Sequence, residues 1–81
     1  MSMIFATVAV VCTMSICSEY VIDPANDQSD AETNTVIHQS EYNRVWQDEK
    51  GLTNWLEKYQ IGESIFEIVS IDIETQEIET P

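Results

Sequence analysis

The side chains best suited to chemistry in this sequence are carboxylates, which form two groups far apart along the chain. One group lies in a polar stretch over residues 23–32 and the other in an alternating segment near the C-terminus: Asp23, Asp27, Asp30 and Glu32, then Asp72, Glu74 and Glu77. Clustered carboxylates can bind divalent cations, act as acid–base pairs, or present negative charge to a basic partner. Their spacing and surroundings decide among these three roles.

The first group does not have the pattern of a calcium-binding loop. In an EF-hand loop that starts at Asp23, the glycine position is Gln28 and the glutamate position is Asn34. The only histidine, His38, and the two cysteines are too few for a zinc site or a catalytic dyad. Two glycines eleven residues apart exclude a glycine-rich phosphate loop. The sequence therefore predicts neither a metal site nor a cofactor.

Carboxylate pairs such as Asp72 with Glu74 do not by themselves indicate catalysis. A catalytic carboxylate needs a pocket that shifts its pKa. A chain of 81 residues leaves little volume for such a pocket beside its core. We therefore expect a protein that is not an enzyme.

The charge balance points to a basic partner. Fifteen acidic residues and three basic ones give a net charge of −12, and Arg44, Lys50 and Lys58 all lie in one central segment. Nucleic acid and anionic membranes attract positive charge, so both are poor partners for this chain. A large net charge repels itself within the folded protein, and a cationic partner would offset that repulsion.

Residues 4–16 contain the strongest structural pattern. Every second residue is apolar: Ile4, Ala6, Val8, Val10, Cys12, Met14 and Ile16. Side chains alternate between the faces of a strand, so we expect a long central strand, or two strands with a bend near Thr13. On one continuous strand Cys12 and Cys17 would lie about 16 Å apart, and only a turn could pair them. We expect two reduced thiols, as in a cytosolic protein.

The rest of the chain alternates between strand and helix patterns. Residues 18–22 continue the strand or form a second one, and residues 23–32 are expected to be an acidic loop. A short strand or irregular turn follows at 34–38, although Ser29 and Glu32 match a capping box that would start a helix.

A helix is expected from Ser40 to about Tyr59, where apolar residues recur at three- and four-residue steps. It either continues through Gly51 or breaks there. The segment from Ser64 to Ile78 alternates again and predicts a final strand.

This order predicts one small α+β domain over residues 1–81. An antiparallel or mixed β-sheet has one main helix, continuous or broken at Gly51, packed on one face. The expected core consists of Val8, Val10, Val45, Leu56, Val69 and Ile71. The other face and the sheet edges are left open, so two copies of the chain can pair as a homodimer.

Residues 3–17 also have a weak likeness to an export signal. The apolar run ends at Cys17, as a lipoprotein signal does, but no basic residue precedes it and Ile16 is too large for the position before cleavage. The run is also too short to span a bilayer. We therefore expect a cytoplasmic protein, and a small exported, lipoprotein-like protein is the third interpretation.

The acidity itself suggests a function. Carboxylates two apart on a strand, such as Asp72 and Glu74, lie about 6.6 Å apart, close to the advance of alternate phosphates along the axis of a DNA strand, which carries one charge per about 3.4 Å of axis. In size, charge and architecture the whole chain resembles the small inhibitors of host defence from phages and mobile elements, which include DNA mimics, anti-restriction proteins and anti-CRISPR proteins.

The resemblance implies an inhibitor that acts in the host cytoplasm. Its seven carboxylates would occupy the basic surface of a nucleic-acid-handling complex, without direct contact to nucleic acid. The alternative is a non-catalytic accessory or structural domain that dimerises through its sheet.

Overall fold

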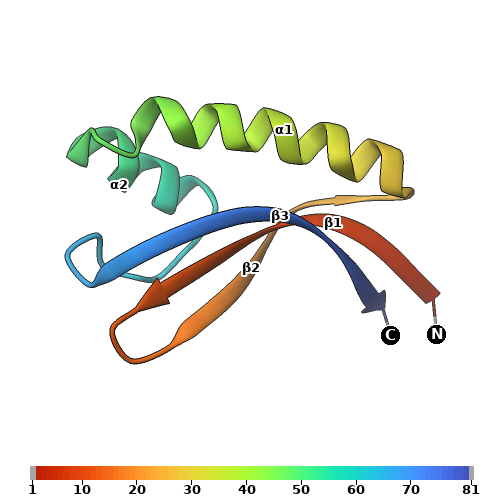
Figure 1. Ribbon diagram of the computed structural model, residues 1–81, viewed down its shortest axis with the longest axis horizontal. Helices are drawn as coiled ribbons and strands as arrows, with labels where there is room; N and C mark the ends of the chain where they lie inside the picture. Colours follow the sequence, from red (N-terminus) through yellow and green to blue (C-terminus); the bar gives the residue numbers. More distant parts are fainter. Residues whose placement is uncertain (1, 81) are drawn as a thin grey trace.

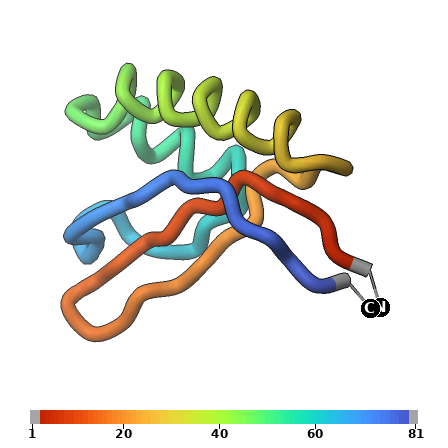
Figure 2. Tube along the Cα trace, turned by 45° about the vertical axis from the view of Figure 1, so that its right-hand side comes forward, coloured from red at the N-terminus to blue at the C-terminus, as the bar shows by residue number. Residues whose placement is uncertain are grey.

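Three strands and two helices make up the fold in the computed structural model, which describes residues 2–80 (Figure 1). In chain order they are β1 (Ser2–Thr13), β2 (Cys17–Ala25), α1 (Gln28–Val45), α2 (Glu49–Lys58) and β3 (Ile68–Thr80). The strands form one antiparallel sheet in the order β2-β1-β3. Both helices lie on the same side of this sheet (Figures 1 and 2). The predicted α+β class, with helix packed on one face, is confirmed.

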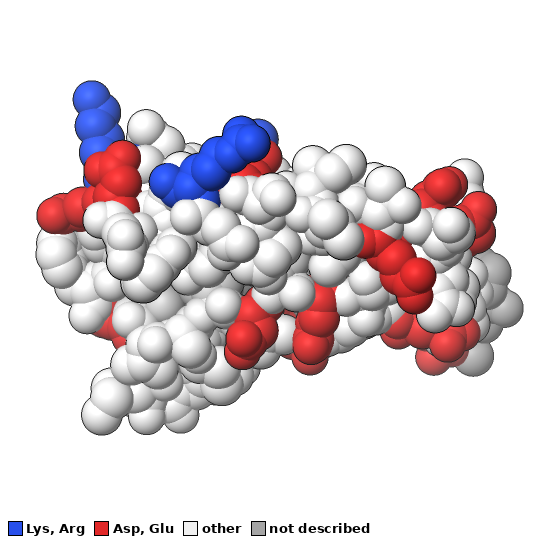
Figure 3. All heavy atoms as spheres, turned by 45° about the horizontal axis from the view of Figure 1, so that its top comes forward, with Lys and Arg blue, Asp and Glu red and all other residues white. Residues whose placement is uncertain are grey.

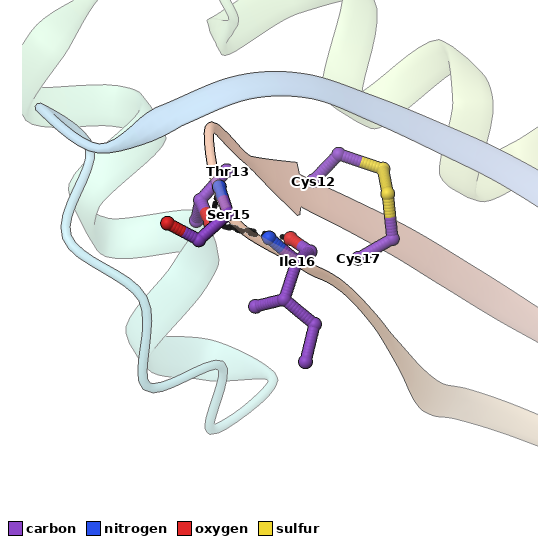
Figure 4. The surroundings of a disulfide bond; sticks show 5 residues. All are labelled: Cys12, Thr13, Ser15, Ile16 and Cys17. Carbon is purple, nitrogen blue, oxygen red and sulfur yellow. Dashed lines mark hydrogen bonds between the residues drawn. A yellow bond between two sulfur atoms is a disulfide. The ribbon is translucent and has the colours of Figure 1, made fainter.

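The chain turns sharply after β1. The backbone N–H of Thr13 donates to the carbonyl of Ile16 at 2.8 Å, and the Thr13 hydroxyl oxygen accepts from the N–H groups of Ser15 and Ile16 at 3.3 Å each (Figure 4). A threonine whose side chain bonds to the backbone in this way favours a turn over a continued strand. Of the two predicted arrangements, two strands with a bend near Thr13 is the correct one.

This hairpin overturns the prediction of two reduced thiols. Cys12 and Cys17 are register partners across β1 and β2, and they form a disulfide bond (Figure 4). The estimate that kept them apart assumed a continuous strand, whereas a hairpin brings residues on opposite arms to within bonding distance.

The helices cover the face of β1 that carries Ala9 and Val11. Ala9 and Val11 pack with Trp55, Leu56 and Ile61 in the core, and both are essentially buried. Because alternate residues face opposite ways, the fully apolar set from Ile4 to Cys12 lies on the other face, which we call the bare face.

Two core residues on the bare face are nevertheless fully buried. Ala6 and Val8 have no exposed surface. The Gln76 side-chain amide donates to Glu74 of β3 at 2.6 Å and to Glu19 of β2 at 3.4 Å. Because β1 lies between those strands, this polar bridge crosses it and shields the apolar side chains beneath.

The predicted core is partly correct. Leu56 is buried between sheet and helix as predicted, and Val45 and Ile71 pack against the same core, whereas Val8 is buried on the bare face, away from the helices. Val69 is 58% exposed because β3 bulges there: Cys12 pairs with Ser70 and Thr13 with Ile68, so Val69 has no partner. Val10 is only half-buried, and it lies on the bare face rather than beneath the helices.

The prediction of an acidic loop and a short strand over 23–38 is wrong, because α1 begins at Gln28. Asp27 caps this helix by accepting from the N–H of Asp30 at 2.8 Å. The Thr35 hydroxyl then meets Thr7 of β1 at 2.9 Å and Thr75 of β3 at 2.7 Å. These contacts to the sheet outweigh the low helix propensity of the threonine-rich segment.

The helical region breaks over residues 46–48, three residues before Gly51. The N–H of Trp46 still bonds to the carbonyl of Tyr42, and α2 begins after Asp48. Gly51 lies inside α2, where an added Cβ would lie 2.7 Å from the Asp48 carboxylate and 3.2 Å from Val45. Glycine is therefore needed where the two helices meet, and it is not the site of the break.

Candidate partner-binding surface

The seven carboxylates predicted to form one acidic surface lie in different places. Asp72 and Glu74 lie on the bare face, opposite Val10 and Val8 of β1. Glu77 lies on the other face, because the odd-numbered residues of β3 such as Thr75 contact α1. The structure thus keeps Asp72 and Glu74 together and separates them from the rest.

The acidic residues of the predicted loop belong to the beginning of α1. Asp27 is its N-cap, Asp30 lies in its first turn, and Glu32 accepts a hydrogen bond from Gln28 at 3.1 Å. Negative charge at a helix N-terminus is favourable because it complements the helix dipole. These three side chains are exposed, but the helix itself accounts for their position.

Asp23 is turned away from the bare face by a bulge. Thr7 pairs with Asp23 and Val8 with Val21, so Ile22 is an extra residue in β2. Without it, Asp23 would share a face with Glu19 and Val21. With it, the Asp23 carboxylate faces α1 and accepts from Nε2 of His38 at 2.8 Å.

This hydrogen bond belongs to a network that ties three elements together. Nδ1 of His38 lies 3.0 Å from the Tyr59 hydroxyl, which also donates to the Glu41 carboxylate at 3.0 Å. Lys58 contacts the same carboxylate at 3.3 Å. Burial first, and then the hydrogen bond to Glu41, raise the pKa of Tyr59 above its usual value.

The network resembles a proton relay only in its residue types. A catalytic histidine needs a nucleophile or substrate within hydrogen-bond reach, whereas both ring nitrogens of His38 contact other members of the network. The His38 side chain is also only 12% exposed. We therefore assign this group a structural role, connecting β2, α1 and the end of α2.

The bare face carries a third carboxylate that the sequence patterns did not identify. Glu19 pairs with Val10, which also pairs with Asp72 on its other side. The two carboxylates therefore flank Val10 in one row across the sheet, with their Cα atoms about 10 Å apart. Glu74 lies one row further along. We call Glu19, Asp72 and Glu74 the acidic strip.

The strip is exposed, and within residues 2–80 the basic side chains lie elsewhere. All three side chains are exposed, and Gln76 bridges Glu19 and Glu74. Arg44, Lys50 and Lys58 lie instead on the two helices, which cover the opposite face. Figure 3 shows these basic side chains gathered over the junction of α1 and α2, and acidic side chains at the end where α1 begins.

Exposed apolar side chains gather at the end of the sheet nearest the hairpin. Met14 is 89% exposed, Phe66 82%, Ile16 64% and Val69 58%. Phe66 borders two surface hollows of about 370 and 290 Å³. Alternation had placed Met14 and Ile16 on an apolar strand face, and the turn puts them in solvent instead.

Within residues 2–80, no group of three or more His, Cys, Asp or Glu side chains is arranged to hold a metal ion. No described helix combines the length and the apolar character needed to cross a membrane. In comparisons with known proteins, the chain matches no protein-family model, and no curated protein and no solved structure is similar to it.

Proposed function

We propose that this protein is a non-catalytic binding protein whose acidic strip attaches to a basic surface of a nucleic-acid-handling protein and excludes nucleic acid from it. One observation carries the proposal. Three exposed carboxylates stand on the bare face of the sheet, on the side opposite the chain's three basic residues. A surface of one sign attracts a partner of the opposite sign and speeds its association.

The geometry of the strip supports competition with a nucleic-acid backbone. Asp72 and Glu74 are two apart on β3, so their Cα atoms lie about 6.6 Å apart, and a DNA strand advances about 6.8 Å along the helix axis over two phosphates. The molecule is 37 Å long, which is close to one turn of B-DNA at about 34 Å.

The apolar residues between the carboxylates favour a protein as the partner. Val10 separates Glu19 from Asp72, and Val21 on the same face is 53% exposed. Protein interfaces combine an apolar centre with a polar rim, whereas binding to a simple polycation would need only the charge. We place this activity in the cytoplasm of a host cell, where such partners act on nucleic acid.

The alternative function, a domain that dimerises through its sheet, is less well supported, because the bare face carries like charges. A two-fold dimer would place the same patch of both copies in contact, so Glu19, Asp72 and Glu74 would meet their own copies. Like charges in an interface are costly. Pairing through the open edges of β2 or β3 avoids this repulsion and is the remaining form of the dimer hypothesis.

The disulfide favours a second candidate, an exported binding protein. Disulfides persist in oxidising compartments and are rare in the cytosol. The lipid-anchored form is less well supported, because Cys17 is bonded to Cys12 and because removal of the residues before Cys17 would delete β1, the central strand.

Affinity capture followed by displacement tests the leading proposal. A basic partner captured from a cell lysate is loaded with labelled DNA or RNA, and the release of the nucleic acid is measured at low and high salt. Wild type should release it, and Asp72→Lys with Glu74→Lys should be at least about tenfold weaker, with most of the difference in the association rate. Salt should reduce the wild-type effect because exposed charges are screened.

A matched charge reversal provides the control. Glu32→Lys with Glu79→Lys changes the net charge equally at exposed positions outside the strip. This variant should stay within about twofold of wild type, since it leaves the strip intact. Equal inhibition by all three proteins at every salt concentration would show that the strip is only a solvated surface.

A further inference from the structure

A groove with an apolar floor lies on the helix side of the molecule, away from the acidic strip. One wall is a single face of α2, because Glu49, Thr53 and Glu57 follow one another at four-residue steps, and Leu56 lies one turn after Thr53. The other wall is the segment 61–66, which contributes Ile61 and Ile65. The hollow is about 290 Å³, at the lower end of the range of ligand pockets.

The groove is built into the fold. The N–H of Ile61 donates to the Leu56 carbonyl at 2.9 Å, and the Tyr20 hydroxyl donates to Glu63 on the rim at 3.2 Å. Leu56 and Ile61 are 3% and 5% exposed, so the floor is continuous with the core. A surface held in this way loses little conformational entropy when a partner binds.

Phe66 stands at the edge of this groove as an exposed aromatic ring. A turn fixes its backbone: its N–H donates to the Ser64 hydroxyl at 3.3 Å, and the Glu67 N–H donates to the Ser64 carbonyl at 3.0 Å. On its other side is a second hollow bordered by Met14 and Val69. Contiguous exposed apolar groups with a polar rim mark interaction sites, and aromatic residues dominate their energetics.

The rim selects the chemistry of the occupant. Glu49, Glu57 and Glu63 line the groove and Glu67 lines the second hollow. Among the residues that the structure describes, no lysine or arginine borders either one. An anionic membrane or a second copy with net charge −12 would bring negative charge to this rim. A Lys- or Arg-rich segment would bring the complementary charge.

We infer that the groove, together with Phe66, is a docking site for a basic amphipathic segment of a partner protein. An apolar side chain of that segment enters the groove beside Phe66, and its basic side chains meet the carboxylates of the rim. The site is separate from the acidic strip, because α2 and the strip lie on opposite sides of the sheet. The inference therefore does not depend on the proposed function.

Three synthetic peptides test both parts of this inference. One is an amphipathic helix of leucine and lysine, the second replaces each leucine by serine, and the third replaces each lysine by glutamate. Fluorescence anisotropy at physiological salt measures their binding to the full chain. The leucine–lysine peptide should bind at least about tenfold more tightly than the other two, because it alone supplies both contacts.

Two variants and one control locate the binding. Phe66→Ser should weaken the leucine–lysine peptide by about tenfold without changing thermal unfolding, since the ring is 82% exposed. Glu49→Gln with Glu57→Gln should weaken it severalfold. Asp72→Lys with Glu74→Lys should leave it within about twofold, because that change lies on the bare face.

Several results would overturn the inference. Equal binding of the serine–lysine peptide would mean that charge alone attracts the peptides and the groove is not used. A concentration-dependent dimer in sedimentation that Phe66→Ser abolishes would make a second copy the occupant. Suppose that Asp72→Lys with Glu74→Lys loses peptide binding while the groove variants keep it. The peptide would then bind at the acidic strip and not in the groove. The displacement assay on that same variant tests the proposed function separately.

Discussion

The two faces of the sheet use polar residues in opposite ways. On the covered face, polar groups bond to one another across elements: Thr7 with Thr35, and Asp23 with His38. On the bare face, polar side chains such as Gln76 shield buried apolar residues from above while their charged neighbours stay in water. The first arrangement holds the helices to the sheet, and the second leaves charge available to a partner.

The comparison also shows that a buried residue of β1 need not lie on the face that the helices cover. Val8 is as fully buried on the bare face as Ala9 is beneath the helices. Ala9 is covered by packed apolar side chains of the core cluster, whereas the cover over Val8 includes the polar bridge made by Gln76. Equal exposure therefore does not imply an equal contribution to stability.

The largest expected difference between the faces is in core packing. Leu56→Ala should lower the free energy of unfolding by about 2–5 kcal/mol, because it leaves a cavity beneath α2. Val10→Ala on the half-buried bare face should cost about 1 kcal/mol or less. Urea denaturation of both variants measures the two losses. Equal losses would contradict the distinction between the covered and bare faces.

The disulfide is the next largest effect, and it belongs to the bare face. Reduction should lower the free energy of unfolding by roughly 2 kcal/mol, the amount expected for a bond that closes so short a loop. Denaturation with and without reductant measures it, and Cys12→Ser with Cys17→Ser should not respond to reductant. Quantitative thiol labelling of protein isolated without reductant is the direct check. Two labelled cysteines in that protein would remove the main support for the exported candidate.

The smallest effect concerns pH and the covered face. The pKa of Tyr59 is raised in the folded protein, so the folded state holds this proton more tightly than the unfolded state does. Its contribution to stability is complete below about pH 10 and is lost as pH rises through the folded pKa. Tyr59→Phe should therefore show a shallower loss of stability above pH 10 than wild type does.

Chemical denaturation across this pH range provides the measurement. Tyr20 and Tyr42 also have raised pKa values through burial, so part of the alkaline loss should remain in the variant. Identical pH profiles for wild type and Tyr59→Phe would show that the network around His38 does not stabilise the protonated tyrosine.

Much of the site was beyond the reach of local sequence patterns. Alternation placed Asp72 and Glu74 on one strand face, and the structure keeps them there. Glu19 joins them only because the hairpin register sets β2 beside β1. Asp23 lies on the opposite face because β2 contains one extra residue. Such a bulge depends on the pairing between strands rather than on the local sequence pattern.

The sequence by itself determined the class of this protein. Alternation along residues 4–16 and 64–78 predicted strands, the spacing around Leu56 and Tyr59 predicted a helix, and the composition set the charge. Each of these follows from the geometry of one element, since a period of two or of about 3.6 residues is a local property.

Only the tertiary structure decided how these elements are used. It made a helix of residues 28–39, because Thr35 bonds to two strands far away in the sequence. It also put Ala9 and Val11 of β1 beneath the helices and paired Cys12 with Cys17. Periodicity separates two faces without saying which one will be covered, because that depends on contacts with residues far away in the sequence, such as those of Thr7 with Thr35 and of Ala9 with the core cluster.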